Sequence, residues 1–211
     1  MKIYLDSADL GEISKISGID YIHGVTTNPT FFKEQGIKDE EEFINKLLEI
    51  LPNKEIHLEA MGQVHEIINN VEKYNNLYKN NNFVYKIPCN REGLFATNLI
   101  KINEMEVKTN LHLVYSTYQA LLAAKNGATY ICPLMGKFED EGNDPIKLIG
   151  DIKKVYDNYN IKTEIIVSSI RRVEHIEEIL KIGVDGVTIP YKIFVKMHSH
   201  ELTSKGIELF R

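Results

Sequence analysis

Short apolar runs rich in β-branched residues alternate along this chain with longer amphipathic segments. The short runs predict buried strands, because four to eight apolar residues between turn signals are typical of them. They lie at Lys2–Ser7, Gly24–Thr27, Glu55–Met61, Phe83–Pro88, Thr109–Tyr115, Thr129–Leu134, Thr163–Ser169 and Gly186–Pro190. The longer segments predict helices, since their apolar residues recur at helical spacing. The clearest of these are Glu40–Leu51, Ser116–Asn126, Pro145–Asn160 and Val173–Ile182.

This alternation predicts an α/β fold built on a parallel sheet. We count eight strand–helix units, and eight such units that close on themselves form a (β/α)8 barrel, also called a TIM barrel. The chain has 211 residues, close to the lower limit of about 200 for that fold, so its loops must be short. A doubly wound open sheet is the structural alternative. No linker-like composition interrupts the chain, so we expect a single domain over residues 1–211, with 201–211 as a C-terminal helical tail.

Composition and charge indicate which partners and which cellular compartment to expect. The formal net charge is −5, whereas nucleic-acid binders usually carry a strong basic excess. The two cysteines, Cys89 and Cys132, are far apart and form no CxxC pair, which disfavours a disulfide scaffold or a zinc site. No stretch reaches the roughly 18 uncharged apolar residues of a membrane helix. We therefore expect a cytoplasmic protein with no metal, no cofactor, no nucleic-acid partner and no membrane partner.

Polar residues occur at or near the carboxyl ends of several predicted strands, where a barrel should be apolar. They are Asp6, Asn28, Glu59, Lys86, Asn110, His112 and Ser169. Barrel enzymes place their active sites at the carboxyl ends of the strands. A single Asp or Asn at such a position is more often a turn or a helix N-cap. Lys86 is different, because a buried ammonium group costs several kcal/mol unless it is paired or neutral.

The environment of Lys86 suggests nucleophilic chemistry. The residue lies within the apolar run Phe83–Pro88, and burial is expected to lower its pKa and to raise the fraction of neutral amine. A neutral amine can attack a carbonyl and lose water to give an iminium ion. That ion is an electron sink for cleavage of the neighbouring carbon–carbon bond. Asp6 and Glu59 can supply the proton transfers. The alternative is a structural ion pair between Lys86 and Glu59 or Asp6.

Motifs along almost the whole chain resemble those of one family, the small transaldolases and fructose-6-phosphate aldolases. The matching stretches are IYLDSAD (3–9), GVTTNPT (24–30), YKIP (85–88), EGL (92–94), TNLHLVYS (109–116), QALLAAKNGATYICP (119–133), VSSIR (167–171) and GVDGVTIP (183–190). TTNP, KIP and SSIR together are far more specific than any lone motif. The resemblance implies a class I, Schiff-base mechanism and a place in the pentose phosphate pathway.

The resemblance also implies roles for individual residues. Lys86 matches the Schiff-base lysine and Asp6 the acid/base residue. Glu59 matches the glutamate that positions a catalytic water in transaldolases, where relatives that act only as aldolases tend to carry glutamine. The implied substrate-binding residues are Thr27, Asn28, Asn110 and Cys132, and the implied phosphate-binding residues are Ser169, Arg171 and Lys137.

Three of these positions depart from the pattern of the relatives. His112 replaces a threonine that relays protons through water, Cys132 replaces a serine, and Lys137 replaces a second arginine. Lysine keeps the positive charge but lacks the bidentate fork of arginine. Imidazole transfers protons near neutral pH, and His112 shares a strand face with Asn110, so we expect His112 to lie in the site and to replace the relay. The alternatives are that His112 crowds the site or is only a core residue.

The implied function is that of a transaldolase. It would move a dihydroxyacetone unit between fructose 6-phosphate or sedoheptulose 7-phosphate and erythrose 4-phosphate or glyceraldehyde 3-phosphate. A fructose-6-phosphate aldolase that releases dihydroxyacetone is one alternative. A non-catalytic barrel that binds sugar phosphates is another. The resemblance also implies a homo-oligomer, a decamer of two five-membered rings.

Overall fold

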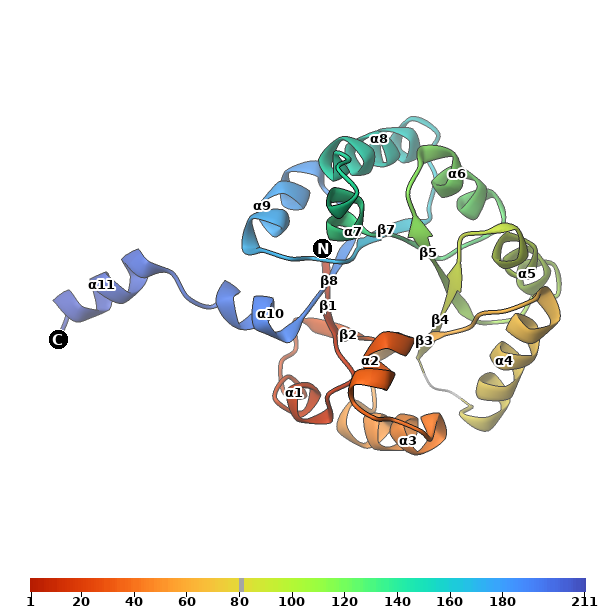
Figure 1. Ribbon diagram of the computed structural model, residues 1–211, viewed down its shortest axis with the longest axis horizontal. Coiled ribbons are helices and arrows are strands. Elements are labelled where there is room, and N and C mark those ends of the chain that lie inside the picture. The colour runs from red at the N-terminus through yellow and green to blue at the C-terminus, as the bar shows by residue number, and fades with distance from the viewer. Residues whose placement is uncertain (80–81) are drawn as a thin grey trace.

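In a computed structural model, which describes residues 1–79 and 82–211, eight parallel strands close into a barrel (Figure 1). The strands pair in chain order, and the last pairs back with the first. They are β1 (Lys2–Asp6), β2 (Ile22–Thr26), β3 (Glu55–Glu59), β4 (Phe83–Pro88), β5 (Lys108–Val114), β6 (Tyr130–Pro133), β7 (Glu164–Val167) and β8 (Gly186–Ile189). The predicted (β/α)8 barrel is confirmed, and the open-sheet alternative is wrong.

Most of the helices surround the barrel on its outer face, and the last one extends away from it (Figure 1). They are α1 (Leu10–Ser14), α2 (Pro29–Glu34), α3 (Glu40–Ile50), α4 (Val64–Leu77), α5 (Arg91–Ile102), α6 (Thr117–Lys125), α7 (Met135–Asp140), α8 (Pro145–Asn158), α9 (Val173–Ile182), α10 (Tyr191–Met197) and α11 (Glu201–Leu209). Capping residues mark where the helices begin and end. The Ser116 hydroxyl accepts a hydrogen bond from the Gln119 amide at the start of α6. Gly183 ends α9 in the left-handed conformation, with φ of 80°.

Strand β4 shows how the two faces of the barrel wall are used. Tyr85 and Ile87 point outward into the large apolar core between strands and helices. Val84 points inward, where it packs with Tyr4, Tyr130 and Ile166 in a separate buried cluster. Lys86 follows Val84 on the inward face and therefore lies one layer closer to the carboxyl ends of the strands. The barrel thus has an apolar and aromatic floor beneath a polar layer.

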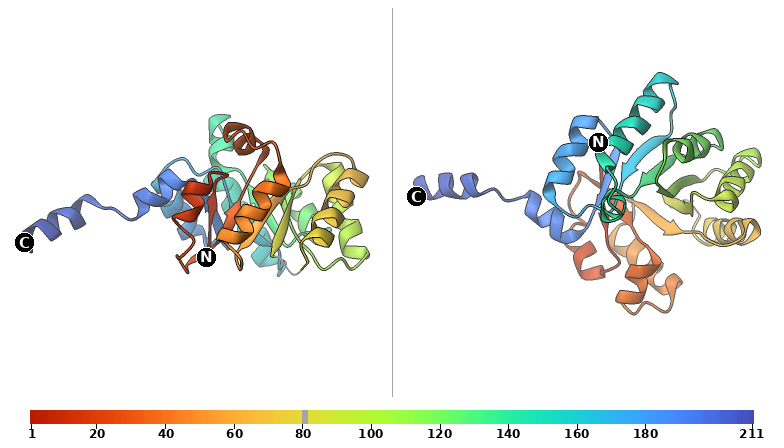
Figure 2. Two further views of the ribbon diagram at one scale, coloured as in Figure 1. Left: turned by 90° about the horizontal axis from the view of Figure 1, so that it is seen from below. Right: turned by 45° about the horizontal axis from the view of Figure 1, so that its top comes forward.

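Helix α11 extends away from the barrel, as both views in Figure 2 show. Its apolar side chains are exposed, with Leu202 at 69%, Leu209 at 85% and Phe210 at 91% of their full accessible surface. Such exposure is unusual for large apolar side chains on a helix with no partner. In the described part of the chain, no helix has the length and apolarity needed to cross a membrane.

Candidate active site

A cavity of about 510 Å³ opens at the carboxyl ends of the barrel strands. Every site residue predicted from the sequence lines it except Thr27: Asp6, Asn28, Glu59, Lys86, Asn110, His112, Cys132, Lys137, Ser169 and Arg171. The alternation of side chains along parallel strands brings these residues to one place, because the carboxyl ends of all eight strands meet there.

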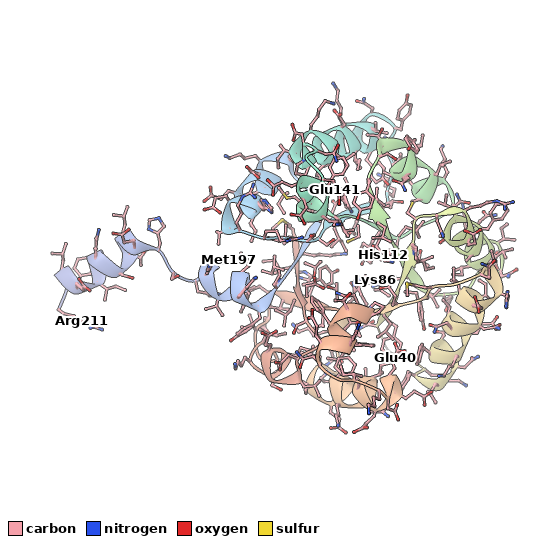
Figure 3. All side chains as sticks on the ribbon, viewed as in Figure 1. Glu40, Lys86, His112, Glu141, Met197 and Arg211 are labelled. Carbon is pink, nitrogen blue, oxygen red and sulfur yellow. The ribbon has the colours of Figure 1, made fainter. Side chains whose placement is uncertain are left out.

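Three ionisable side chains meet at the centre of this cavity. Lys86 Nζ donates a hydrogen bond to Glu59 Oε2 at 3.1 Å and another to the carbonyl oxygen of Thr27 at 2.6 Å. The other carboxylate oxygen, Glu59 Oε1, lies 2.5 Å from His112 Nε2. Strand pairing fixes this arrangement, because Lys86 is in register with Glu59 on β3 and with Asn110 on β5. Figure 3 shows Lys86 and His112 next to each other inside the barrel.

The charge state of Lys86 differs from the one expected from burial alone. Burial acts to lower the pKa of Lys86, but the carboxylates of Glu59 and Asp6 outweigh it and hold the pKa above its ordinary value. The prediction of a lowered pKa for Lys86 is therefore wrong. Burial likewise acts to raise the pKa of Glu59, but Lys86 and His112 outweigh it and hold that pKa low. The resting site contains an ammonium ion against a carboxylate.

Asp6 provides the contrasting carboxyl group. Burial raises its pKa above the ordinary value, and the opposing effects of Lys86 and the Thr26 hydroxyl do not compensate. Thr26 Oγ1 donates to Asp6 Oδ1 at 2.7 Å and lies 2.6 Å from Thr188 Oγ1. Two carboxyl groups with pKa values moved in opposite directions are suited to acid and base roles in one reaction.

The remaining predicted residues take different positions around this centre. Cys132 is 3% exposed, and burial raises the pKa of its thiol to about 11, so the sulfur is a neutral part of the wall. Asn28 caps α2 by accepting from the Phe31 amide while it lines the cavity. The Thr27 hydroxyl instead donates to the carbonyl of His57 at 3.0 Å, so only the Thr27 backbone reaches the lysine.

Basic and polar groups form the outer end of the cavity. Ser169 has a φ of 60°, and its hydroxyl accepts a hydrogen bond from the Lys137 amide at 3.1 Å. Arg171 is half-exposed and donates to Asp140 at 2.7 Å. Gly136 leaves room for it, since a Cβ there would lie 2.6 Å from Arg171 Cγ. An anionic substrate group bound here would compete with Asp140 for the guanidinium.

Strand β5 has an irregularity beside His112 that the sequence did not indicate. The register with β6 shifts between His112 and Val114, and the intervening Leu113 has a left-handed φ of 59°. Such bulges redirect side chains next to active sites. Leu113 lines the cavity as a result, although strict alternation would turn it toward the helices.

The sequence profile of the transaldolase/fructose-6-phosphate aldolase family matches residues 3–209. This chain belongs to that family. A probable transaldolase 2 of Listeria monocytogenes is 42% identical over 211 residues, which cover 100% of this chain and 94% of that protein. A probable transaldolase of Streptococcus pyogenes is 39% identical, with 100% and 96% covered.

Solved structures show the same architecture at much lower identity. A flavocytochrome b2 mutant with benzoylformate superposes with a TM-score of 0.61 and 12% identity, over 90% of this chain and 56% of that one. This likeness concerns the fold alone, because barrels of this kind carry many unrelated activities. The functional assignment of this transaldolase family member therefore depends on the sequence relatives and on the cavity.

Proposed function

We propose that this protein is a transaldolase that moves a dihydroxyacetone unit between sugar phosphates through a Schiff base on Lys86. The observation that carries the proposal is the buried contact of Lys86 with Glu59, 3.1 Å apart, with His112 on the far carboxylate oxygen. The alternative of a purely structural ion pair does not account for the open cavity, since Lys86 lines it together with Asp6.

The resting ammonium ion must lose a proton before it can attack a carbonyl. Asp6 and Glu59 are the acceptors within this site, and Asp6 is the better of the two because its pKa is raised. The amine then adds to the ketose carbonyl, and loss of water leaves an iminium ion on Lys86. Removal of a proton from the substrate hydroxyl breaks the adjacent carbon–carbon bond. The aldose leaves, and the dihydroxyacetone unit remains on Lys86 as an enamine. The enamine carbon attacks the acceptor aldehyde, which gives a new iminium ion on Lys86. Water adds to this iminium ion, and cleavage of the carbon–nitrogen bond releases the product ketose and restores the Lys86 amine.

The phosphate of the substrate would bind at Ser169, Arg171 and Lys137. Arginine offers a planar fork of donors that suits a phosphate, and the Lys137 ammonium adds a point charge. Helix α9 begins at Val173, and no side chain among the described residues caps it, so no cap would compete with an anion for its first amides. The substrates we propose are fructose 6-phosphate and sedoheptulose 7-phosphate as donors, with glyceraldehyde 3-phosphate and erythrose 4-phosphate as acceptors.

One assay separates this proposal from its alternatives. The protein is incubated with fructose 6-phosphate, with and without erythrose 4-phosphate, and both sedoheptulose 7-phosphate and free dihydroxyacetone are measured. A transaldolase forms sedoheptulose 7-phosphate and releases little dihydroxyacetone. Release of dihydroxyacetone at the same rate with or without the acceptor would make it an aldolase. Binding of fructose 6-phosphate without turnover would make it a non-catalytic barrel.

We also propose a homo-oligomer, a decamer of two five-membered rings, in the cytoplasm. The exposed apolar residues of α11 support the assembly, because Leu209 and Phe210 need a covering surface outside their own barrel. The two free cysteines, Cys89 and Cys132, support a reducing compartment. We regard residues 1–211 as one domain, with 201–211 as its tail. Light scattering that reported a monomer at micromolar concentration would contradict the assembly.

A further inference from the structure

His57 is a buried histidine that the reaction above does not use. It lies directly beneath the polar layer that contains Lys86 and Glu59. His57 is on β3, two residues before Glu59, and is 0% exposed. Its ring packs between Tyr4, at 4.8 Å between ring centroids, and Tyr130, at 5.8 Å. In a buried imidazole, the groups that face the two ring nitrogens decide which nitrogen carries the proton.

The amide of Asn110 fixes the role of one ring nitrogen. Asn110 Nδ2 lies 3.1 Å from His57 Nδ1, and an amide nitrogen can only donate. His57 Nδ1 is therefore the unprotonated acceptor, and a neutral ring carries its proton on Nε2. Nε2 lies 3.6 Å from Glu55 Oε2, too far for a hydrogen bond. At that distance the carboxylate still favours an N–H over a lone pair directed at it.

The charges around His57 support this tautomer. Burial acts to raise the pKa of Glu55, but His57, Lys108 and Tyr4 outweigh it and hold that pKa well below its ordinary value. The Tyr4 hydroxyl donates to Glu55 at 2.7 Å and Lys108 donates at 2.5 Å. Burial lowers the pKa of His57, and the opposing effect of Glu55 does not compensate. The result is a neutral imidazole above a charged carboxylate.

This arrangement decides which end of the Asn110 amide remains for the cavity. Nδ2 is directed at His57, so the remaining polar atom is Oδ1, which is buried and has no hydrogen-bond partner among the described residues. Asn110 lines the cavity, and its backbone on β5 is in register with that of Lys86 on β4. An unsatisfied buried acceptor beside a catalytic lysine requires an explanation in terms of function.

We propose that Glu55 and His57 are positioning residues that hold the Asn110 amide with Oδ1 toward Lys86. There Oδ1 accepts a hydrogen bond from the N–H that Lys86 Nζ keeps in the carbinolamine and in the iminium ion. This proposal rests on the Schiff-base function proposed above. In the opposite orientation the amide would present Nδ2, a donor, to a nitrogen that itself carries a proton, and the covalent intermediate would lose that contact.

A matched pair of substitutions tests the orientation. Asparagine and leucine have nearly the same size and shape, so His57→Asn and His57→Leu lose similar packing. The asparagine oxygen can take the place of Nδ1 as the acceptor for Asn110, whereas leucine cannot. We expect His57→Leu to lower kcat by about 10- to 100-fold, with little change in the KM for fructose 6-phosphate, because misplacement of a positioning group costs rates of this order. His57→Asn is expected to retain most of the wild-type kcat.

Equal losses in the two variants, or no loss in either, would overturn the proposal. A second measurement does not depend on folding of the variants. Nitrogen-15 NMR of the histidine side chains in the wild-type protein at pH 7 should show His57 protonated on Nε2 alone, and protonation on Nδ1 would overturn the proposal. Borohydride trapping with fructose 6-phosphate separates the two claims. Absence of a Lys86 adduct in wild type refutes the Schiff base itself. A wild-type rate of adduct formation in His57→Leu refutes only the role of His57.

Discussion

Replacing Glu59 by glutamine removes one charge from the centre of the site and almost nothing else. In the folded protein the Lys86 and Glu59 side chains are only 9% and 10% exposed, and Lys86 Nζ lies 3.1 Å from Glu59 Oε2. With an effective dielectric constant near 20, two unit charges at this distance attract by about 5 kcal/mol. Breaking a buried ion pair by removing one partner costs about 3–5 kcal/mol. Because Asp6 still faces Lys86, we expect the lower end, about 3 kcal/mol of unfolding free energy, for Glu59→Gln.

The pH dependence of this loss follows from the two pKa shifts. The pKa of Glu59 is lowered in the folded protein, so its contribution is present above the ordinary value of 4.5 and is lost as pH falls. The pKa of Lys86 is raised, so its contribution is present below the ordinary value of 10.5 and is lost as pH rises beyond it. The difference between wild type and Glu59→Gln should therefore be largest between these two values and should shrink in acid.

The assay is denaturant unfolding at fixed protein concentration over a series of pH values. Glu42→Gln is the matched control, since Glu42 makes a 2.6 Å ion pair with Lys46 on the exposed face of α3, where such pairs contribute little. We expect no resolvable change for the control. Equal stability of Glu59→Gln and wild type at pH 7, or a difference that does not shrink in acid, would refute the charge assignment of the site.

Three further predictions concern separate parts of the molecule. Arg171→Ala should raise the KM for fructose 6-phosphate about 10- to 100-fold, because it removes a charge-assisted hydrogen bond to the phosphate. The KM for free dihydroxyacetone as donor should not change. Equal effects on both substrates would place Arg171 away from the phosphate. His112→Ala should lower kcat by about 10²–10⁴-fold, while His112→Thr should keep measurable transfer, and wild-type kcat in both would reduce His112 to a packing role. Tyr85→Phe should stabilise the protein by about 1 kcal/mol in thermal unfolding, because the buried Tyr85 hydroxyl has no hydrogen-bond partner among the described residues. A destabilised variant would contradict this, since it would mean that the hydroxyl has a partner.

The fold and the composition of the site could be predicted because both follow from local pattern and from one topological rule. Apolar runs with polar ends locate the strands, and the carboxyl ends of parallel barrel strands meet at one edge. Asp6, Glu59, Lys86 and His112 were therefore expected together, and the structure brings them to one cavity. Strand β2 begins at Ile22, two residues earlier than the predicted start at Gly24. The apolar pattern does not indicate this start, because the polar His23 separates Ile22 from the rest of the strand.

What could not be predicted depends on distances between residues far apart in the sequence. The direction of the Lys86 pKa shift is set by the carboxylates of Glu59, 3.1 Å away, and of Asp6, whereas the apolar neighbours of Lys86 indicate only burial. The contact of His57 with Asn110 joins residues 53 positions apart. The Thr27 hydroxyl turns toward the His57 carbonyl, away from the cavity, and a motif match carries no information on that rotation.

The measurement that tests the central claim most directly is chemical capture of the covalent intermediate. The protein is incubated with fructose 6-phosphate, reduced with borohydride, digested and analysed by peptide mass spectrometry, with Lys86→Arg as the control because guanidinium stays protonated. The account predicts a reduced dihydroxyacetone unit on Lys86 in wild type and no adduct in Lys86→Arg. An adduct on another lysine, or none with any ketose phosphate, would contradict it.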